Sequence, residues 1–258
     1  MARMPDGFID LTVTSPPYDN LRDYHNDVSE KWGPAIWEPI IKDLYRVTKD
    51  GGVVVWVVGD ATINGSETGT SFRQALWAME CGFNLHDTMI YQRPTLFPGN
   101  VRYSQDFEYM FVFSKGKPST INIIRDRLNK NLGNLDKKKL TIRLKDGKTL
   151  SDKANGRIVG KYGERSNIWA IHAGYLISSP DKIAYEHHAI FPEKLAADHI
   201  YSWSNEGDLV YDPFMGSGTT AKMAHLQKRN WIGSELSQEF TDLAYKRLDP
   251  YLRQQRLF

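Results

Sequence analysis

Hydrophobic positions along the chain follow two periods, one typical of strands and one typical of helices. Short apolar runs such as VVVWVV at 53–58, preceded by Gly-Gly, are typical of strands buried on both faces. Segments such as 36–47 place apolar residues three and four positions apart, as on one face of a helix. The pattern predicts strands at 8–14, 53–58, 85–91, 107–113, 208–211 and 231–234 and helices at 36–47, 70–80, 193–204, 219–227 and 239–248. This alternation predicts an α/β fold with a mostly parallel, doubly wound sheet.

Residues 115–168 interrupt this alternation. They are basic and rich in Asn and Gly, with a hairpin pattern around Asp146-Gly147. Between 115 and 165 there are 15 Lys and Arg against 5 Asp and Glu, whereas the rest of the chain has 18 against 26. A basic segment inside an acidic frame favours a polyanion partner, although a solvated loop would have the same composition. The sequence therefore predicts three parts, which are 1–114, a basic insert at 115–180, and 181–258.

The composition is that of an ordinary globular protein, with 41% hydrophobic and 25% charged residues among 258. No apolar run approaches the roughly 18 to 20 residues of a membrane span, and the first ten residues lack the apolar core of a secretory signal. Cys81 is the single cysteine, which excludes an intrachain disulfide and a cysteine metal cluster. We therefore expect a cytoplasmic protein without a membrane segment or a bound metal.

The first predicted strand stops at Ser15-Pro16-Pro17-Tyr18. Proline has no N–H to donate to a sheet, so two consecutive prolines end the strand. The stretch presents a hydroxyl, carbonyl oxygens and an aromatic ring with few hydrogen-bond donors. In a parallel α/β sheet, the carboxyl ends of the strands are where ligands bind.

A second motif lies between 209 and 237. A predicted strand ends at Asp212-Pro213, and Gly216-Ser217-Gly218-Thr219-Thr220 opens the following helix. Glycines allow a ligand to approach the backbone, and free amides at a helix N-terminus bind anions. Glu235, at the end of the next strand, can accept hydrogen bonds from ribose hydroxyls. The anion could be a phosphate or a carboxylate.

Together with AIFPEKLAADHI at 189–200, these two motifs resemble the amino-methyltransferases of DNA, which use S-adenosylmethionine. The catalytic motif of that family is (D/N/S)PP(Y/F/W). The order of catalytic motif, basic insert and cofactor motif is similar to the circularly permuted beta class. The resemblance implies a Rossmann-like methyltransferase fold, double-stranded DNA as partner and the insert as target-recognition region. A homodimer is an expectation by analogy alone.

The resemblance also implies residue roles. The Ser15 hydroxyl and the Pro16 carbonyl would accept hydrogen bonds from the exocyclic amine, next to Pro17, and Tyr18 would stack on a base flipped out of the duplex. Cofactor contacts are expected from Asp212, Pro213, Phe214, Gly216, Ser217, Gly218, Thr219, Thr220, Glu235, Phe191, Asp19 and Asp60. DNA contacts are expected from Lys137, Lys138, Lys139, Arg143, Lys145 and Lys148. For the cofactor positions, a turn or helix-capping role is the alternative.

The identity of the target base is left open by the motif. In this family Ser in the first position favours N4 of cytosine, and Asp or Asn favours N6 of adenine. The motifs are also compatible with a catalytically silent DNA-binding protein on the same scaffold, and with methylation of RNA or of a small molecule. Carbon-5 methylation of cytosine needs a cysteine nucleophile that follows a proline, whereas Cys81 lies between Glu80 and Gly82.

One family feature is missing from the sequence. Members usually carry a further strand ahead of the catalytic one, near the adenine ring of the cofactor, but about seven residues precede Phe8 here. We therefore expect weak cofactor binding, or a pocket completed by a second subunit.

Overall fold

The computed structural model of the chain describes residues 1, 3–19, 32–94, 102–130, 132–133, 140–152 and 158–253. It divides into two compact units. The main unit comprises Met1–Asn122 and Asn167–Phe258, and the insert unit comprises Ile123–Ser166. The insert unit lies within the basic insert expected at 115–180.

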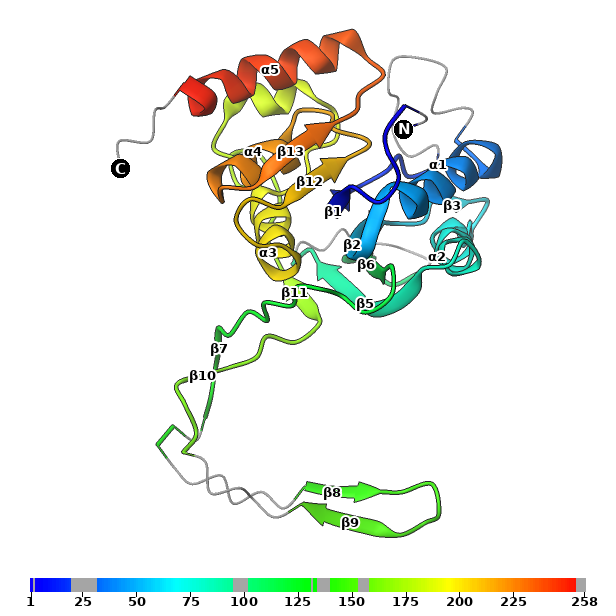
Figure 1. The fold of residues 1–258 in the computed structure, drawn as a ribbon, viewed down its shortest axis with the longest axis vertical. Helices are drawn as coiled ribbons and strands as arrows, with labels where there is room; N and C mark the ends of the chain where they lie inside the picture. The colour runs from blue at the N-terminus through cyan, green and yellow to red at the C-terminus, as the bar shows by residue number, and fades with distance from the viewer. Residues whose placement is uncertain are drawn as a thin grey trace. The chain divides into compact units, whose positions relative to one another are not determined.

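A seven-stranded sheet forms the centre of the main unit (Figure 1). Its order is β11-β5-β6-β2-β1-β12-β13. The strands are β1 (Ile9–Thr14), β2 (Thr48–Val58), β5 (Asn84–Gln92), β6 (Phe107–Ser114), β11 (Ile168–Ala170), β12 (Leu209–Asp212) and β13 (Asn230–Gly233). β6 runs antiparallel to both of its neighbours, and the other pairings of this sheet are parallel. The predicted mostly parallel sheet is confirmed.

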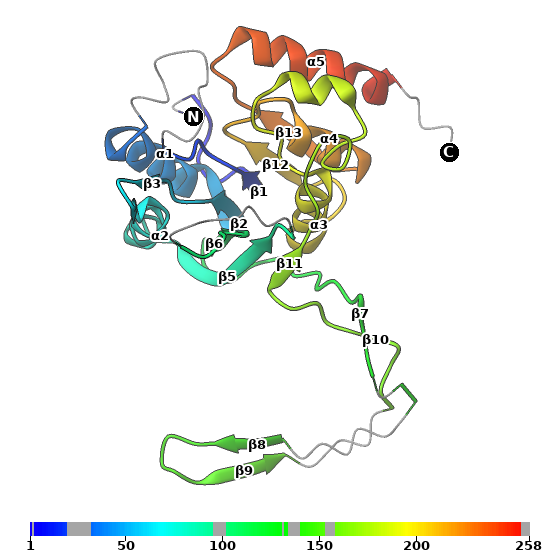
Figure 2. The same ribbon diagram turned by 180° about the vertical axis from the view of Figure 1, so that it is seen from behind.

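Helices cover both faces of this sheet, as the two opposite views show (Figures 1 and 2). One face carries α1 (Pro34–Val47) and α2 (Thr70–Glu80), and the other carries α3 (Glu193–Trp203), α4 (Thr219–Leu226) and α5 (Gln238–Arg253). The proline at the start of α1 has its φ preset for a helix and lacks only an amide hydrogen that would be unpaired there. All the helices and strands predicted from periodicity are confirmed, with ends that differ by a few residues.

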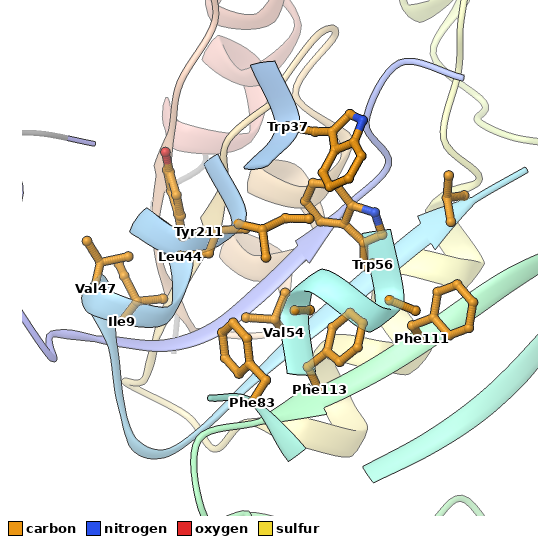
Figure 3. Close-up of a cluster of buried hydrophobic side chains, with 14 of the residues drawn as sticks. Ile9, Trp37, Leu44, Val47, Val54, Trp56, Phe83, Phe111, Phe113 and Tyr211 are labelled. Atoms are coloured by element: carbon orange, nitrogen blue, oxygen red, sulfur yellow. The ribbon is translucent and has the colours of Figure 1, made fainter. Parts of the chain in front are cut away.

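The core between the sheet and the first helical pair is strongly aromatic (Figure 3). Trp37 and Leu44 of α1 pack toward Trp56 of β2 and Tyr211 of β12, all of them nearly fully buried. Phe111 of β6 lies in the same cluster. Burying such side chains contributes roughly 1.5 to 3 kcal/mol each relative to exposure, so this cluster fixes the central strands against one another.

The remaining elements are short. The main unit also has a two-stranded ribbon, β3 (Thr62–Ile63) with β4 (Ser66–Glu67), and a 3-10 helix, η2 (Lys182–Glu186). In the insert unit, β7 (Arg127–Leu128) pairs with β10 (Tyr162–Gly163), and β8 (Leu140–Arg143) pairs with β9 (Thr149–Asp152). The β8–β9 pair is the hairpin predicted around Asp146-Gly147, and it turns at Gly147 with φ 82°. β11, which falls inside the predicted insert by sequence, pairs instead with β5 at the edge of the main sheet.

In the described part of the chain, no helix is both long enough and apolar enough to cross a membrane.

Candidate active site

A cavity of about 380 Å³ opens at the carboxyl ends of the parallel strands. Two segments distant in sequence meet there because β1 and β12 are adjacent in the sheet. The predicted site residues that line this cavity are Ser15, Pro16, Pro17, Tyr18, Phe191, Asp212, Pro213, Phe214, Gly216, Ser217, Thr219 and Glu235. The fold therefore brings the catalytic motif and most of the cofactor motif to one place.

A directed pair of hydrogen bonds organises the Ser-Pro-Pro-Tyr stretch. The Ser15 hydroxyl donates to the Tyr18 phenolic oxygen over 2.9 Å, and that phenol donates to Oε2 of Glu108 over 2.8 Å. A phenol has one proton, and because Tyr18 donates it to Glu108, its oxygen accepts the bond from Ser15. The lone pairs of the Ser15 oxygen that remain can then accept a hydrogen bond from an amine in the cavity.

Asp212 connects the catalytic strand to the cofactor motif. Its Oδ1 accepts hydrogen bonds from the Thr14 hydroxyl at 2.6 Å and from the Phe214 amide at 3.0 Å. Burial raises the pKa of Asp212 to about 6, while the bonds from Thr14 and Phe214 partly oppose the increase. Asp212 therefore lies at the junction of the two motifs and is bonded to both.

The glycine-rich turn adopts a conformation that its sequence permits. Gly216 and Gly218 have φ values of 48° and 79°, in the left-handed region that glycine occupies readily. A Cβ on Gly216 would lie 2.8 Å from Nε2 of His187. The Gly216 amide donates to Glu235 over 2.9 Å, so the end of β13 is connected to the turn.

A buried ionic cluster contacts the same glycine-rich turn through Arg247. It comprises Asp181, Glu193, Lys222 and Arg247. The fully buried Arg247 guanidinium pairs with Asp181 at 2.9 Å and with Glu193 at 2.7 Å, and Lys222 pairs with the same two carboxylates at 2.8 and 2.7 Å. Arg247 also donates to the Ser217 carbonyl at 2.9 Å, to the Ser217 hydroxyl and to the Thr219 hydroxyl. Ser217 and Thr219, both expected to contact the cofactor, are thus held by a cation of this chain.

The cluster shifts the titration of its own members. Burial alone would raise the pKa of Asp181, but hydrogen bonds from Lys222, Arg247 and Tyr251 outweigh burial and lower it. For Lys222, burial acts to lower the pKa, and the hydrogen bonds to Asp181 and Glu193 outweigh it and raise the pKa. Both directions favour the charged forms of Asp181 and Lys222.

Four of the predicted cofactor residues lie outside the cavity wall. Thr220 is buried, and its hydroxyl donates to the Val13 carbonyl over 3.1 Å. Gly218 lies behind the turn, where an added Cβ would meet Ala244 at 3.3 Å. Asp60 accepts hydrogen bonds from the Ser71 amide and hydroxyl in the first turn of α2. Asp19 accepts one from the Thr68 hydroxyl at 2.6 Å. These two carboxylates act as turn and capping residues in this structure.

The predicted DNA-contacting residues divide into two groups. Arg143, Lys145 and Lys148 lie at or beside the turn of the β8–β9 hairpin and are exposed. Lys137, Lys138 and Lys139 lie outside the described residues.

Several cavity residues were not singled out from the sequence. Trp32, Ile36 and Ile40 give one apolar wall, and Trp32 packs edge-on against Phe214 at 5.6 Å between ring centroids. Tyr91, Arg93 and Glu108 give a polar wall beside Tyr18. Arg93 carries no sequence signal of its own, and the pairing of β5 with β6 places it beside Glu108.

The apolar wall, Glu235 and the glycine-rich turn fit S-adenosylmethionine by their chemistry. An apolar surface with aromatic rings suits a purine, the Glu235 carboxylate suits hydroxyl groups, and the turn at the start of α4 suits a carboxylate. A family model for DNA methylases, of the type that methylates N6 or N4 amines, matches residues 9–246. The chain belongs to this DNA methylase family. The amino-methyltransferase resemblance seen in the motifs is thereby confirmed, and with it the cofactor, S-adenosylmethionine, and DNA as substrate.

Individual relatives agree with the family. The chain is 58% identical to the orphan methyltransferase M.BamHII of Bacillus amyloliquefaciens, over 96% of this chain and 91% of that protein. Its fold is similar to that of the PvuII DNA methyltransferase, described as cytosine-N4-specific, with a TM-score of 0.66 and 21% identity over 95% of this chain and 81% of that one. It is also similar to TTHA0409 of Thermus thermophilus in complex with S-adenosyl-L-methionine, with a TM-score of 0.64 and 22% identity over 98% and 90% of the two chains. The predicted Rossmann-like methyltransferase fold is therefore confirmed.

Proposed function

We propose that this DNA methyltransferase transfers the methyl group of S-adenosylmethionine to the exocyclic N4 of a cytosine flipped out of double-stranded DNA. The observation that carries the proposal is the direction of the Ser15–Tyr18–Glu108 hydrogen bonds, which leaves the Ser15 oxygen as an acceptor at the cavity. The Ser at the first position of the motif supports cytosine over adenine.

The reaction is a direct displacement. Bound S-adenosylmethionine supplies a methyl group on a positively charged sulfur, which is a good leaving group. If the amine nitrogen bonds to the methyl carbon, the sulfur–carbon bond would break with its electron pair on sulfur and leave S-adenosylhomocysteine, and the proton lost from nitrogen would pass to water. Because the lone pair of this amine is delocalised into the base, the protein has to make the amine more nucleophilic.

The residues of the motif perform this task by hydrogen bonding and position. The Ser15 hydroxyl and the Pro16 carbonyl accept hydrogen bonds from the amine and draw it toward tetrahedral geometry. Tyr18 stacks on the ring, an interaction worth on the order of 1 to 3 kcal/mol per base. Holding nitrogen, methyl and sulfur in line supplies the proximity term of the rate enhancement.

The insert unit is proposed as the target-recognition region. Its exposed Arg143, Lys145 and Lys148 are suited to phosphate contacts, and the motif order agrees with the permuted beta class. Such contacts position the protein on the duplex and carry no sequence information by themselves.

A methyl-transfer assay tests the proposal. The protein is incubated with labelled S-adenosylmethionine and unmethylated genomic DNA, and the nucleosides are then analysed by mass. N4-methylcytosine is the expected product. If the product is N6-methyladenine, the family and the cofactor remain correct and the assignment of cytosine as the target base is wrong. If no methylated nucleoside forms, the proposed methyltransferase activity is wrong.

A further inference from the structure

Two polar atoms beside the Ser-Pro-Pro-Tyr motif are buried without a hydrogen-bond partner in the described part of the chain. They are the Tyr91 hydroxyl and Nε of Arg93. Both residues line the cavity, and Tyr91 is 2% exposed. Buried polar groups in folded proteins are nearly always paired, so two unpaired donors on one cavity wall point to acceptors on a ligand.

The strand pairing keeps these donors together with the catalytic motif. Tyr91 lies opposite Glu108 in the antiparallel β5–β6 ladder, and Arg93 lies two residues further along the same chain. The Arg93 amide donates to the Asp106 carbonyl, so the strand-like pairing continues past the end of β5. Residues two apart on a strand share a face, which places both side chains on the face of Glu108.

Glu108 connects the two donors to Tyr18. Its Oε2 accepts the hydrogen bond from the Tyr18 phenol, and its Oε1 lies 3.5 Å from Nη1 of Arg93. The guanidinium is therefore anchored through Nη1, while no described residue pairs with Nε. Among the described residues, Trp32 Nε1 also lacks a partner at the cavity, but its ring packs against Phe214 of the cofactor motif.

We propose that Tyr91 and Arg93 are specificity-determining residues that donate hydrogen bonds to the ring N3 and the O2 of the flipped cytosine, while its N4 faces Ser15 and Pro16. The inference rests on the proposed function. Enzymes that flip a base read its Watson–Crick edge by such hydrogen bonds.

The same pair of donors discriminates against adenine. From its amine onward, the Watson–Crick edge of cytosine presents two acceptors, N3 and then O2. The corresponding edge of adenine presents one acceptor, N1, followed by a C–H group. An adenine in this site would leave one of the two donors buried and unpaired. Sites built to hydrogen-bond a substrate group reject analogues that lack this group.

The test compares Tyr91→Phe and Arg93→Lys with the wild type on unmethylated genomic DNA, and uses Tyr45→Phe as the matched control. Tyr91→Phe removes only the hydroxyl, and Arg93→Lys retains the charge near Glu108 but lacks the Nε donor. Tyr45 lies outside the cavity and carries an equally conservative change. We expect each of the two cavity variants to lower kcat/KM by about tenfold. The ratio of N6-methyladenine to N4-methylcytosine should rise, the Kd for S-adenosylmethionine should not change, and the melting temperature should not fall.

The possible outcomes separate this inference from the function on which it rests. If the wild type makes N4-methylcytosine and both cavity variants match Tyr45→Phe in kcat/KM and in product ratio, the base-reading role is wrong and the function stands. If the wild type makes N6-methyladenine, the cytosine contacts are overturned together with the base assignment. If the wild type methylates neither base, the proposed function fails. A lower melting temperature for Tyr91→Phe, with unchanged activity of the folded fraction, would assign Tyr91 a structural role and overturn the inference.

Discussion

The Thr14 hydroxyl donates a 2.6 Å hydrogen bond to the Asp212 carboxylate, across 198 positions of sequence. Thr14 is the last residue of the catalytic strand, and Asp212 is the last residue of the strand that leads into the cofactor turn. Both side chains are buried. This bond fixes the carboxyl ends of β1 and β12 relative to each other, and thereby the two motifs of the site.

Removal of the Thr14 hydroxyl is expected to destabilise the folded protein. Thr14→Val retains the shape of the side chain and leaves Asp212 without one of its donors, which should lower the free energy of unfolding by about 1 to 3 kcal/mol. Thr14→Ser retains the donor and serves as the control. Urea denaturation at neutral pH measures both variants, and equal stability of the Val and Ser variants would show that the bond contributes nothing.

Asp212 should also give the stability a distinctive pH dependence. Because its folded pKa, about 6, lies above its ordinary value of 3.8, the folded state binds more protons than the unfolded state between these pH values. This contribution to stability is therefore fully present below about pH 4 and is lost as the pH rises through 6. Asp212→Asn removes this pH-dependent contribution. Between pH 4 and 7 the free energy of unfolding of the wild type should therefore fall by about 2 to 3 kcal/mol more than that of the variant.

The control for this titration is Asp50→Asn, because the Asp50 side chain is 96% exposed. Chemical denaturation at a series of pH values gives the difference in free energy of unfolding between the wild type and each variant. The Asp50 variant should run parallel to the wild type, and a parallel profile for Asp212→Asn would contradict the buried titration.

The buried ionic cluster predicts a coupled loss of stability and cofactor affinity. Arg247→Met removes one of the two cations that pair with Asp181 and Glu193, and it removes the hydrogen bonds to Ser217 and Thr219. Breaking buried ion pairs in this way is expected to lower the free energy of unfolding by about 3 to 5 kcal/mol. Arg247→Lys should recover part of the stability but not the bonds to the turn. Arg253→Met, at an exposed site of the same helix, is the control.

Two readouts are needed for this variant series. Denaturation gives stability, and calorimetric titration with S-adenosylmethionine gives affinity under conditions where each variant is folded. We expect the Kd to rise for both Arg247 variants. A Kd that stays constant while stability falls would limit the cluster to a structural role.

Gly216 provides a test of the cofactor turn that does not alter any charge. Gly216→Ala should raise the Kd for S-adenosylmethionine by about tenfold or more, because a Cβ there would lie 2.8 Å from His187 and would displace a wall of the cavity. Gly65→Ala is the matched control, since Gly65 also has a positive φ but open space around it. Similar effects of the two substitutions on the Kd would point to general backbone strain instead.

The sequence predicts the elements of the fold well because each depends on local periodicity. The two motifs could also be placed at one sheet edge, since both follow strands that run parallel. β11 was missed because three residues carry no periodic signal, and its pairing with β5 depends on segments far apart in the chain.

Within the site, the residues that sequence reasoning missed are those whose role depends on pairing. Arg247 lies in a helix with charged residues on both sides, and its complete burial follows from the position of Asp181 and Glu193. Glu108 reaches Tyr18 only because β6 runs antiparallel beside β2. Asp60 resembles a site residue in sequence because it follows a strand, but the Ser71 amide and hydroxyl at the start of α2 donate hydrogen bonds to it.

The insert unit predicts a specific salt dependence of DNA binding. Each phosphate contact that a basic side chain makes releases condensed counterions, so the logarithm of the affinity falls with the logarithm of the salt concentration by about 0.9 per contact. Replacing Arg143, Lys145 and Lys148 with Ala should therefore reduce this slope by roughly 3 and weaken binding similarly for all DNA sequences. The control replaces Lys42, Lys246 and Arg253, which are three exposed cations of the main unit, and changes the net charge by the same amount. Fluorescence anisotropy with duplex DNA between about 50 and 200 mM salt measures both slopes. If the two triple variants lose equal slope, binding follows net charge alone, and the β8–β9 hairpin has no special role in holding the duplex.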